Sequence, residues 1–158
     1  MLELLDHALQ RSRRTEKSTP VLFLDLDFFK TVNNTYGHGV GDQLLAAVAH
    51  RLSHLLRPSD TVARLHGDEF VILCEDLDYP DQAGTIVTRI LEAMAAPFAL
   101  ATARIEMTVS MGIAFADHHH HDPKRVLGDA DAAKCEAKRR GGAGQQVFDP
   151  RVPLSEGR

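Results

Sequence analysis

The chain has 158 residues, of which 44% are hydrophobic and 25% are charged, and its formal net charge is −4. This composition is typical of one globular domain, and the negative charge disfavours general nucleic-acid binding, which depends on neutralising phosphates. No apolar run approaches the roughly 20 residues that span a bilayer, and the first residues lack the pattern of a secretory signal. The two cysteines, Cys74 and Cys135, are typical of a reducing compartment rather than of a disulfide scaffold. We therefore expect a cytoplasmic chain with no membrane segment and no nucleic-acid partner.

The first half of the chain alternates between helical and strand patterns. Apolar residues recur at helical spacing over residues 2–16, and the continuous apolar run Val21–Leu26 is typical of a central strand buried on both faces. Glycines then interrupt the pattern. We expect Asp42 to cap a helix that ends near Arg57, because the residue before a proline disfavours the helical region.

The second half contributes a hairpin, two more helices and further strands. Thr61–Leu65 and Phe70–Leu73 predict a hairpin with a tight turn between them. Helical stripes cover residues 83–94 and 126–137. The remaining strand-like segments are Phe98–Leu100, Ile105–Phe115 and Gln146–Phe148. This order predicts one domain over residues 1–149 with a mixed sheet and helices on its faces, followed by a poorly ordered tail over residues 150–158.

Acidic residues stand at two places that the fold could bring together. Asp25 and Asp27 end the first buried strand, and their spacing of two puts both side chains on one face. Buried carboxylates are costly without a cation, and magnesium prefers carboxylate and phosphate oxygens. A strand that simply runs out into solvent is an equal alternative for these two residues. If the hairpin lies beside the first strand, its turn brings Asp68 toward Asp25, and the carboxylates can share metal on a triphosphate.

Two stretches resemble the signatures of a known family. Residues 23–42, FLDLDFFKTVNNTYGHGVGD, resemble the D-x-D-x-F-K-x-x-N-x-x-x-G-H-x-x-G-D pattern of GGDEF domains, the diguanylate cyclases. Residues 64–70, RLHGDEF, resemble the motif that gives the family its name, with His66 in place of its first glycine. The resemblance runs from about residue 21 to residue 149. It implies an α+β fold with a central, mainly antiparallel sheet of about five strands, like the palm of nucleotidyl cyclases.

The family resemblance also implies an activity and a cofactor. Such enzymes condense two GTP molecules into cyclic di-GMP, with one GTP in each domain of a homodimer. Asp25, Asp68 and the carbonyl of Leu26 would hold Mg²⁺ or Mn²⁺, with two ions expected. Asp68, or alternatively Glu69, would help to remove the proton of the attacking 3′-hydroxyl, and Lys30 would stabilise charge on the phosphates.

Other matching positions would bind the substrate. Asn33 and Asp42 look like the pair that reads the guanine edge, since an amide both donates and accepts and a carboxylate accepts. The full predicted set of substrate-binding residues is Asn33, Asp42, His38, Gly67 and Lys138.

The segment Arg57-Pro58-Ser59-Asp60 resembles the family's R-x-x-D inhibitory site, at the family's spacing from the main motif. Taken alone, this short pattern is equally a helix end followed by a turn. The resemblance implies that cyclic di-GMP binds here and restrains turnover, because an arginine can fork onto a phosphate or a guanine edge.

Two departures from the family pattern support an alternative function. The imidazole of His66 stands where the family keeps a glycine, and Gly142 replaces a phosphate-binding arginine. Lys134-Cys135 also departs from the pattern, in place of a Leu-Tyr pair. The alternative is a degenerate domain that binds GTP or cyclic di-GMP and regulates an adjoining domain. The intact carboxylates and guanine-reading pair favour the enzyme.

The two ends of the chain predict a fragment of a larger regulator. The family's usual N-terminal segment is missing, and the end of the chain resembles the point where such domains lead into an EAL phosphodiesterase domain. We therefore expect EAL or sensory domains as possible neighbours. Phe28, Phe29 and Tyr36 are predicted to be packing residues, and His118–His121 to be an exposed polar loop, with transition-metal binding as the alternative.

Overall fold

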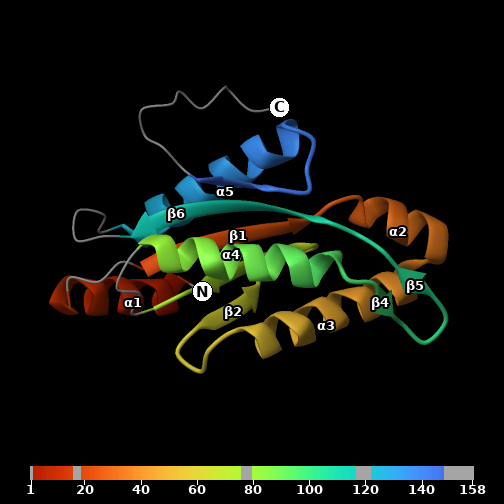
Figure 1. Cartoon of the computed structure of the whole chain (residues 1–158), viewed down its shortest axis with the longest axis horizontal. Helices are drawn as coiled ribbons and strands as arrows, with labels where there is room; N and C mark the ends of the chain where they lie inside the picture. The colour runs from red at the N-terminus through yellow and green to blue at the C-terminus, as the bar shows by residue number, and fades with distance from the viewer. Residues whose placement is uncertain (1, 16–18, 76–79, 117–121, 148–158) are drawn as a thin grey trace.

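The computed structural model describes residues 2–15, 19–75, 80–116 and 122–147 (Figure 1). Its elements, in chain order, are α1 (Leu2–Thr15), β1 (Thr19–Leu26), α2 (Phe29–Tyr36), α3 (His38–Leu55), β2 (Thr61–Arg64), β3 (Glu69–Leu73), α4 (Pro80–Ala95), β4 (Phe98–Ala99), β5 (Arg104–Ile105), β6 (Val109–Ala116), α5 (Pro123–Arg139) and β7 (Gln145–Val147). None of the helices among these described residues combines the length and the apolarity needed to cross a bilayer.

The main sheet has five strands in the order β2-β3-β1-β6-β7, and β4 and β5 form a separate pair. Every pairing in the main sheet is antiparallel except that of β6 with β7. The predicted α+β fold with a mainly antiparallel, five-stranded sheet is therefore confirmed. The central strand β1 is buried along all eight residues, as its continuous apolar sequence predicts.

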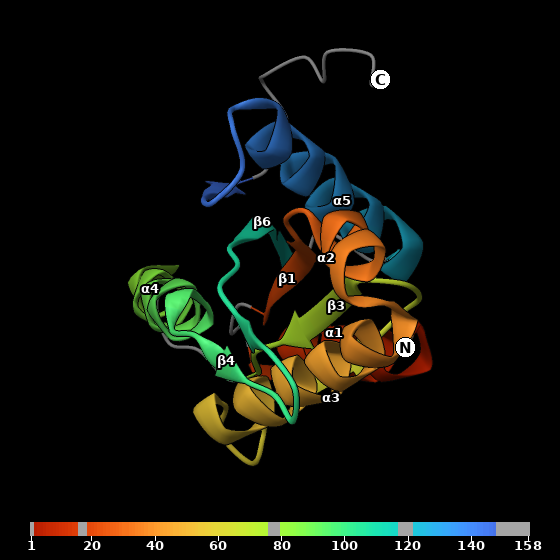
Figure 2. The same cartoon turned by 90° about the vertical axis from the view of Figure 1, so that its right-hand side faces the viewer.

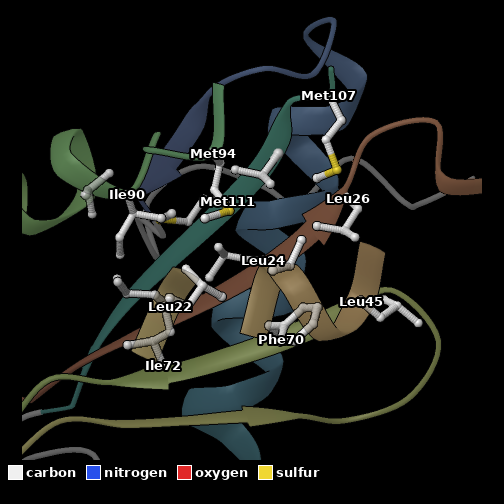
Figure 3. Packing of buried hydrophobic residues seen from close by; sticks show 14 of the residues in the cluster. Leu22, Leu24, Leu26, Leu45, Phe70, Ile72, Ile90, Met94, Met107 and Met111 are labelled. Carbon is white, nitrogen blue, oxygen red and sulfur yellow. The ribbon is translucent and has the colours of Figure 1, made fainter. Parts of the chain in front are cut away.

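Alternate residues of β1 face two separate layers of helices. Leu22 and Leu24 belong to the core cluster that includes side chains of α3 and α4, with Phe70 and Met111 beside them (Figure 3). Val21 and Phe23 belong to a second cluster, which includes side chains of α1 and α5. Figure 2 shows α5 on one side of the sheet and α3 with α4 on the other. Because side chains alternate along a strand, Asp25 lies on the same face as α5.

The structure corrects the predicted elements between β1 and β2. Residues 29–36 form α2, a helix that the sequence pattern does not predict, and α3 begins at His38 rather than at Asp42. Asp42 therefore lies inside α3 and is not its N-cap. Gly37, with φ 90°, is the junction between the two helices. The glycines of this stretch were expected to break the chain, but only this one takes a conformation that favours glycine.

Other predicted elements are confirmed with changed limits. The expected strand over Ile105–Phe115 divides into β5 and β6, and the hairpin of β2 and β3 forms as predicted. Phe29 packs against the core, but Phe28 is 77% exposed with φ 62°, and Tyr36 is 49% exposed. The packing role predicted for Phe28 and Tyr36 is therefore wrong. The four histidines of residues 118–121 and the tail from residue 150 lie outside the described residues.

Candidate functional site

The hairpin turn lies directly beside the end of β1. Asp25 is the register partner of Glu69, and the backbone N–H of Leu26 donates to the carbonyl of Asp68 over 3.3 Å. Gly67 takes φ 56° within the turn, which favours glycine, and its carbonyl accepts from the Nε of Arg64 over 2.8 Å. These contacts hold the predicted motif residues Asp68 and Glu69 against Asp25.

The side chains of Asp25 and Asp68 form a closely spaced carboxylate pair. Burial, a hydrogen bond to Asp25 and the charge of Asp25 together raise the pKa of Asp68 to about 6, although Lys138 opposes this rise. The Oδ1 of Asp25 is buried and has no hydrogen-bond partner among the described residues. Two carboxylates that compete for a proton, with one oxygen left unpaired, form a donor set suited to a hard cation.

The carboxylate of Asp27 has a different environment. One of its oxygens accepts from Ser110 Oγ over 2.6 Å, and the other accepts from Thr108 Oγ1 over 2.6 Å and from the backbone N–H of Ala143 over 2.9 Å. Asp27 thus ties β1 to β6 and to the segment that follows α5. The carboxylate that joins Asp25 is Asp68, so the charged pair spans β1 and the hairpin rather than the end of β1 alone.

Two lysines of α5 lie against the same carboxylates. The Nζ of Lys138 is 3.1 Å from Asp25 Oδ2. Lys134 is only 4% exposed, and its Nζ lies 2.8 Å from Asp131, 3.1 Å from Glu69 and 3.7 Å from Asp25. Burial alone would lower the pKa of Lys134, but its hydrogen bonds to Asp131 and Glu69 outweigh burial and raise it.

Lys134 is a site residue that the sequence analysis does not identify. Its signal was present, because Lys134 falls at helical spacing within the apolar stripe of α5. The buried residues of that stripe are Val126, Ala130, Ala133, Lys134 and Ala137. A lysine on the buried face of a helix needs anionic partners. The carboxylates of residues 64–70 were the candidates for these partners, and Lys134 does contact Glu69.

His66 and Gly142, two of the departures from the family pattern, have distinct environments. His66 is 80% exposed in its side chain, and its Nε2 lies 3.2 Å from Glu69 Oε2. The imidazole therefore points to Glu69, and the left-handed backbone of the turn belongs to Gly67. Gly142 has φ 71°, and a Cβ added there would lie about 3.1–3.2 Å from the carboxylate of Asp27. An arginine at position 142 would thus need a rearranged backbone.

The predicted guanine-reading residues lie together on α2 and α3. A Cβ added to Gly41 would collide with the side-chain oxygen of Asn33, so the Asn33 amide lies over Gly41, next to Asp42. Lys30 and His38 are exposed, on α2 and at the start of α3. Asp42 also lines a cavity of about 530 Å³ together with Ala46, Ala49, Arg64 and Phe70.

The predicted inhibitory residues form a separate cluster at the far end of α3. Arg57 Nη2 donates to Asp60 Oδ1 over 3.0 Å and to the carbonyl of Glu75 over 2.7 Å. Both Arg57 and Asp60 line a cavity of about 300 Å³. Arg57 and Asp60 are therefore an ion pair that lies beside a hollow in the surface.

A preformed cluster of three or more His, Cys, Asp or Glu side chains able to hold a metal is absent from the residues described. Asp25 and Asp68 supply two carboxylates. Magnesium usually takes one or two carboxylates from a protein and the rest of its ligands from water and substrate phosphates. The pair is therefore sufficient for a metal that arrives with a nucleotide.

Comparison with known proteins decides the family. The sequence profile described as "Diguanylate cyclase, GGDEF domain" matches residues 1–143. The chain belongs to the GGDEF domain family. Among curated relatives, it is 37% identical over 145 residues to the bifunctional diguanylate cyclase/cyclic di-GMP phosphodiesterase MucR of Pseudomonas aeruginosa, covering 92% of this chain and 21% of MucR. It is 36% identical over 156 residues to the diguanylate cyclase TpbB of the same species, covering 96% of this chain and 36% of TpbB.

Solved structures agree with this assignment of the GGDEF domain. The crystal structure of the GGDEF domain of TpbB superposes with a TM-score of 0.89 at 35% identity, covering 94% of this chain and 92% of that one. The GGDEF domain of DgcB from Caulobacter crescentus, solved in complex with cyclic di-GMP, gives a TM-score of 0.83 at 25% identity, covering 92% and 86% of the two chains. The chain spans about a fifth to a third of the two curated relatives described above.

Proposed function

We propose that this GGDEF domain condenses two GTP molecules into cyclic di-GMP, with each domain of a homodimer presenting one GTP to the other. The observation that carries the proposal is the pairing of Asp25 with Asp68, together with a buried Asp25 Oδ1 that has no hydrogen-bond partner in the described part of the chain. Carboxylates in this arrangement suit Mg²⁺ or Mn²⁺, with the carbonyl of Leu26 as a further ligand. When bound, the metal would neutralise phosphate charge on the substrate.

The side chains of the chain itself would bind and orient the nucleotide. Asn33 and Asp42 would hydrogen-bond the guanine edge, and the cavity beside Asp42 offers apolar walls for a base. Lys30 and Lys138 would bind phosphates as point charges, with His38 and Gly67 completing the site. Orientation of this kind lowers the barrier because the reacting groups are already in place.

Asp68 is the better candidate for accepting the proton of the attacking 3′-hydroxyl. Glu69 has Lys134 3.1 Å from one carboxylate oxygen and His66 3.2 Å from the other. A carboxylate held on both sides is less available as a base, whereas burial and the neighbouring Asp25 raise the pKa of Asp68 against the opposing charge of Lys138. We therefore assign the proton transfer to Asp68.

A product assay tests the activity. The protein is incubated with GTP and Mg²⁺ or Mn²⁺, and cyclic di-GMP is measured by chromatography, with Asp68→Asn as the inactive control. We expect product from the wild type and none from the variant. An absence of product at high protein concentration, with GTP binding retained, would leave the alternative function. A gain of product in His66→Gly would then identify the imidazole as the cause.

The cluster of Arg57 and Asp60 is proposed to bind cyclic di-GMP and restrain turnover. The Arg57 guanidinium lies beside a hollow, and it can exchange its hydrogen bonds to Asp60 and to the Glu75 carbonyl for bonds to a guanine edge or a phosphate. Calorimetry with cyclic di-GMP should show at least about a tenfold loss of affinity in Arg57→Ala, since a charged hydrogen bond contributes about 1.5–3 kcal/mol. Arg89→Ala, an exposed arginine of α4, is the control. Equal affinities in all three proteins would refute this site.

The alternative function keeps binding but loses catalysis. Gly142 supports it, because the family's arginine is missing there and a side chain at this positive φ, close to Asp27, would be strained. The cyclic di-GMP phosphodiesterase NbdA of Pseudomonas aeruginosa is 37% identical over 140 residues, which cover 18% of that protein. In this alternative, the domain would bind GTP or cyclic di-GMP and regulate a neighbouring EAL or sensory domain of a longer, cytoplasmic protein.

A further inference from the structure

Lys134 is a buried cation on the sheet-facing side of α5. Two of its neighbours at helical spacing, Ala130 and Ala137, are small, apolar and buried, and the other two, Asp131 and Lys138, are charged. An ammonium at 4% exposure is costly to bury, and it persists only when anionic groups hold it. Its Nζ also lies 4.5 Å from the centre of the Phe23 ring. The side chain is thus fixed in one place under the sheet.

The position of this ammonium follows from close packing of α5 on β6. A Cβ added to Gly112 would collide with the backbone of Ala130 and Lys134. The absence of a side chain at Gly112 lets the helix approach until the Lys134 side chain reaches the end of β1. From there, the ammonium contacts Glu69 of β3 and Asp25 of β1.

The Lys134 ammonium contacts Asp25, which is proposed to hold metal, and Glu69, which is next in sequence to the second proposed metal ligand, Asp68. Lys134 and Lys138 both approach Asp25 Oδ2, at 3.7 and 3.1 Å. The other oxygen, Oδ1, has no hydrogen-bond partner within the residues that the structure describes. An ammonium is a donor only and repels a divalent cation at this range. A metal bound to Asp25 would therefore have the Lys134 charge close by, at a position that cannot relax into solvent.

We propose that Lys134 is a built-in counter-ion of this carboxylate cluster, which competes with divalent cations for Asp25 and Glu69 and weakens metal binding by the domain. This inference rests on the proposed metal role of Asp25 and Asp68. The surface lysine Lys138, at 36% side-chain exposure, can swing away when a metal arrives. Lys134 is buried, and its ammonium lies between Asp131 and the Phe23 ring, so we expect it to stay in place.

Manganese binding tests the proposal without any measurement of activity. Mn²⁺ is titrated into the full chain, alone and with a non-hydrolysable GTP analogue, and free Mn²⁺ is followed by electron paramagnetic resonance. The variants are Lys134→Met, which is apolar, and Lys134→Gln, which keeps a hydrogen-bond donor. Lys124→Met removes one exposed charge from the same helix and is the matched control. We expect both Lys134 variants to bind Mn²⁺ at least about tenfold more tightly than the wild type, and Lys124→Met to bind as the wild type does.

Thermal unfolding provides a second readout. With EDTA present, both Lys134 variants should melt below the wild type, because the carboxylates have lost their counter-ion, and saturating Mn²⁺ should restore most of the difference. Unchanged Mn²⁺ affinity in both variants, or variants that stay unfolded at saturating Mn²⁺, would overturn the inference. Asp25→Asn tests the proposed metal site separately from the proposed role of Lys134. If neither the wild type nor any variant binds Mn²⁺ with the nucleotide analogue present, the proposed metal site fails and this inference fails with it.

Discussion

At the scale of single residues, acidic side chains outnumber basic ones at one end of the inner strands β1 and β3. Asp25, Asp68 and Glu69 meet there, and Lys134 and Lys138 are the cations that contact them. Burial and the charge of Asp25 raise the pKa of Asp68 to about 6. Repulsion within this carboxylate pair therefore offsets part of the stability of the fold, which is typical of residues kept for function.

The pH dependence of stability follows from the pKa of Asp68. Because the folded-state pKa lies above the ordinary value of 3.8, the folded protein binds this proton more tightly than the unfolded chain does. This group therefore lowers stability as the pH rises from about 4 to about 6, and the loss is complete at pH 7. In EDTA at pH 7, Asp68→Asn should be more stable than the wild type by about 1–2 kcal/mol, allowing for partial exposure.

Urea unfolding at pH 7 and at pH 4 measures this difference. The advantage of Asp68→Asn should be much smaller at pH 4, where the wild-type carboxyl is protonated in the folded state and about half protonated in the unfolded chain. A variant that gains nothing at pH 7 relative to pH 4 would contradict the account of the carboxylate pair.

At the scale of elements, two glycines set the distances on which the site depends. Gly41 lets α2 and α3 approach with the Asn33 amide between them, and Gly112 lets α5 rest on β6. In both places the neighbouring group occupies the volume that a side chain would need. These contacts determine how closely α2 packs on α3 and how closely α5 packs on the sheet.

Gly41→Ala should displace the Asn33 amide and so weaken the reading of guanine. We expect at least about a tenfold loss of GTP affinity, the cost of about one hydrogen bond to a buried partner. Gly39→Ala, in the same helix, has nothing within 4 Å of the added methyl and should bind GTP as the wild type does. Calorimetry with a non-hydrolysable GTP analogue makes the comparison, and equal affinities would place the guanine elsewhere.

Gly112→Ala should push α5 off the sheet, because the added methyl meets backbone atoms of Ala130 and Lys134. We expect a loss of about 1–3 kcal/mol in the free energy of unfolding. Gly128→Ala, in α5 itself, meets nothing within 4 Å and should gain about 0.5–1 kcal/mol from helix propensity. Urea denaturation measures both, and a neutral Gly112→Ala would show that the helix does not need this contact.

At the scale of the whole molecule, the fold and the carboxylate pair could be predicted, but the short helices and the buried lysine were not. The apolar run of β1 and the hairpin pattern are local features, so both can be predicted from the sequence. The start of α3 is set by packing on α2, and the expected cap at Asp42 is therefore wrong. The burial of Lys134 could be predicted from the helical spacing of α5, but its contacts with Asp25 and Glu69 depend on how α5 packs on the sheet, which no local pattern carries. Propensity is a weak prior wherever tertiary contacts decide the conformation.

One titration tests the central claim that this GGDEF domain holds GTP through a divalent cation at the hairpin turn. A non-hydrolysable GTP analogue is titrated calorimetrically into the wild type and into Asp25→Asn, each with Mg²⁺ and with EDTA. We predict binding by the wild type in Mg²⁺, and at least about a tenfold loss of affinity both in EDTA and in the variant. Binding of equal strength with and without Mg²⁺, unchanged in Asp25→Asn, would contradict the account.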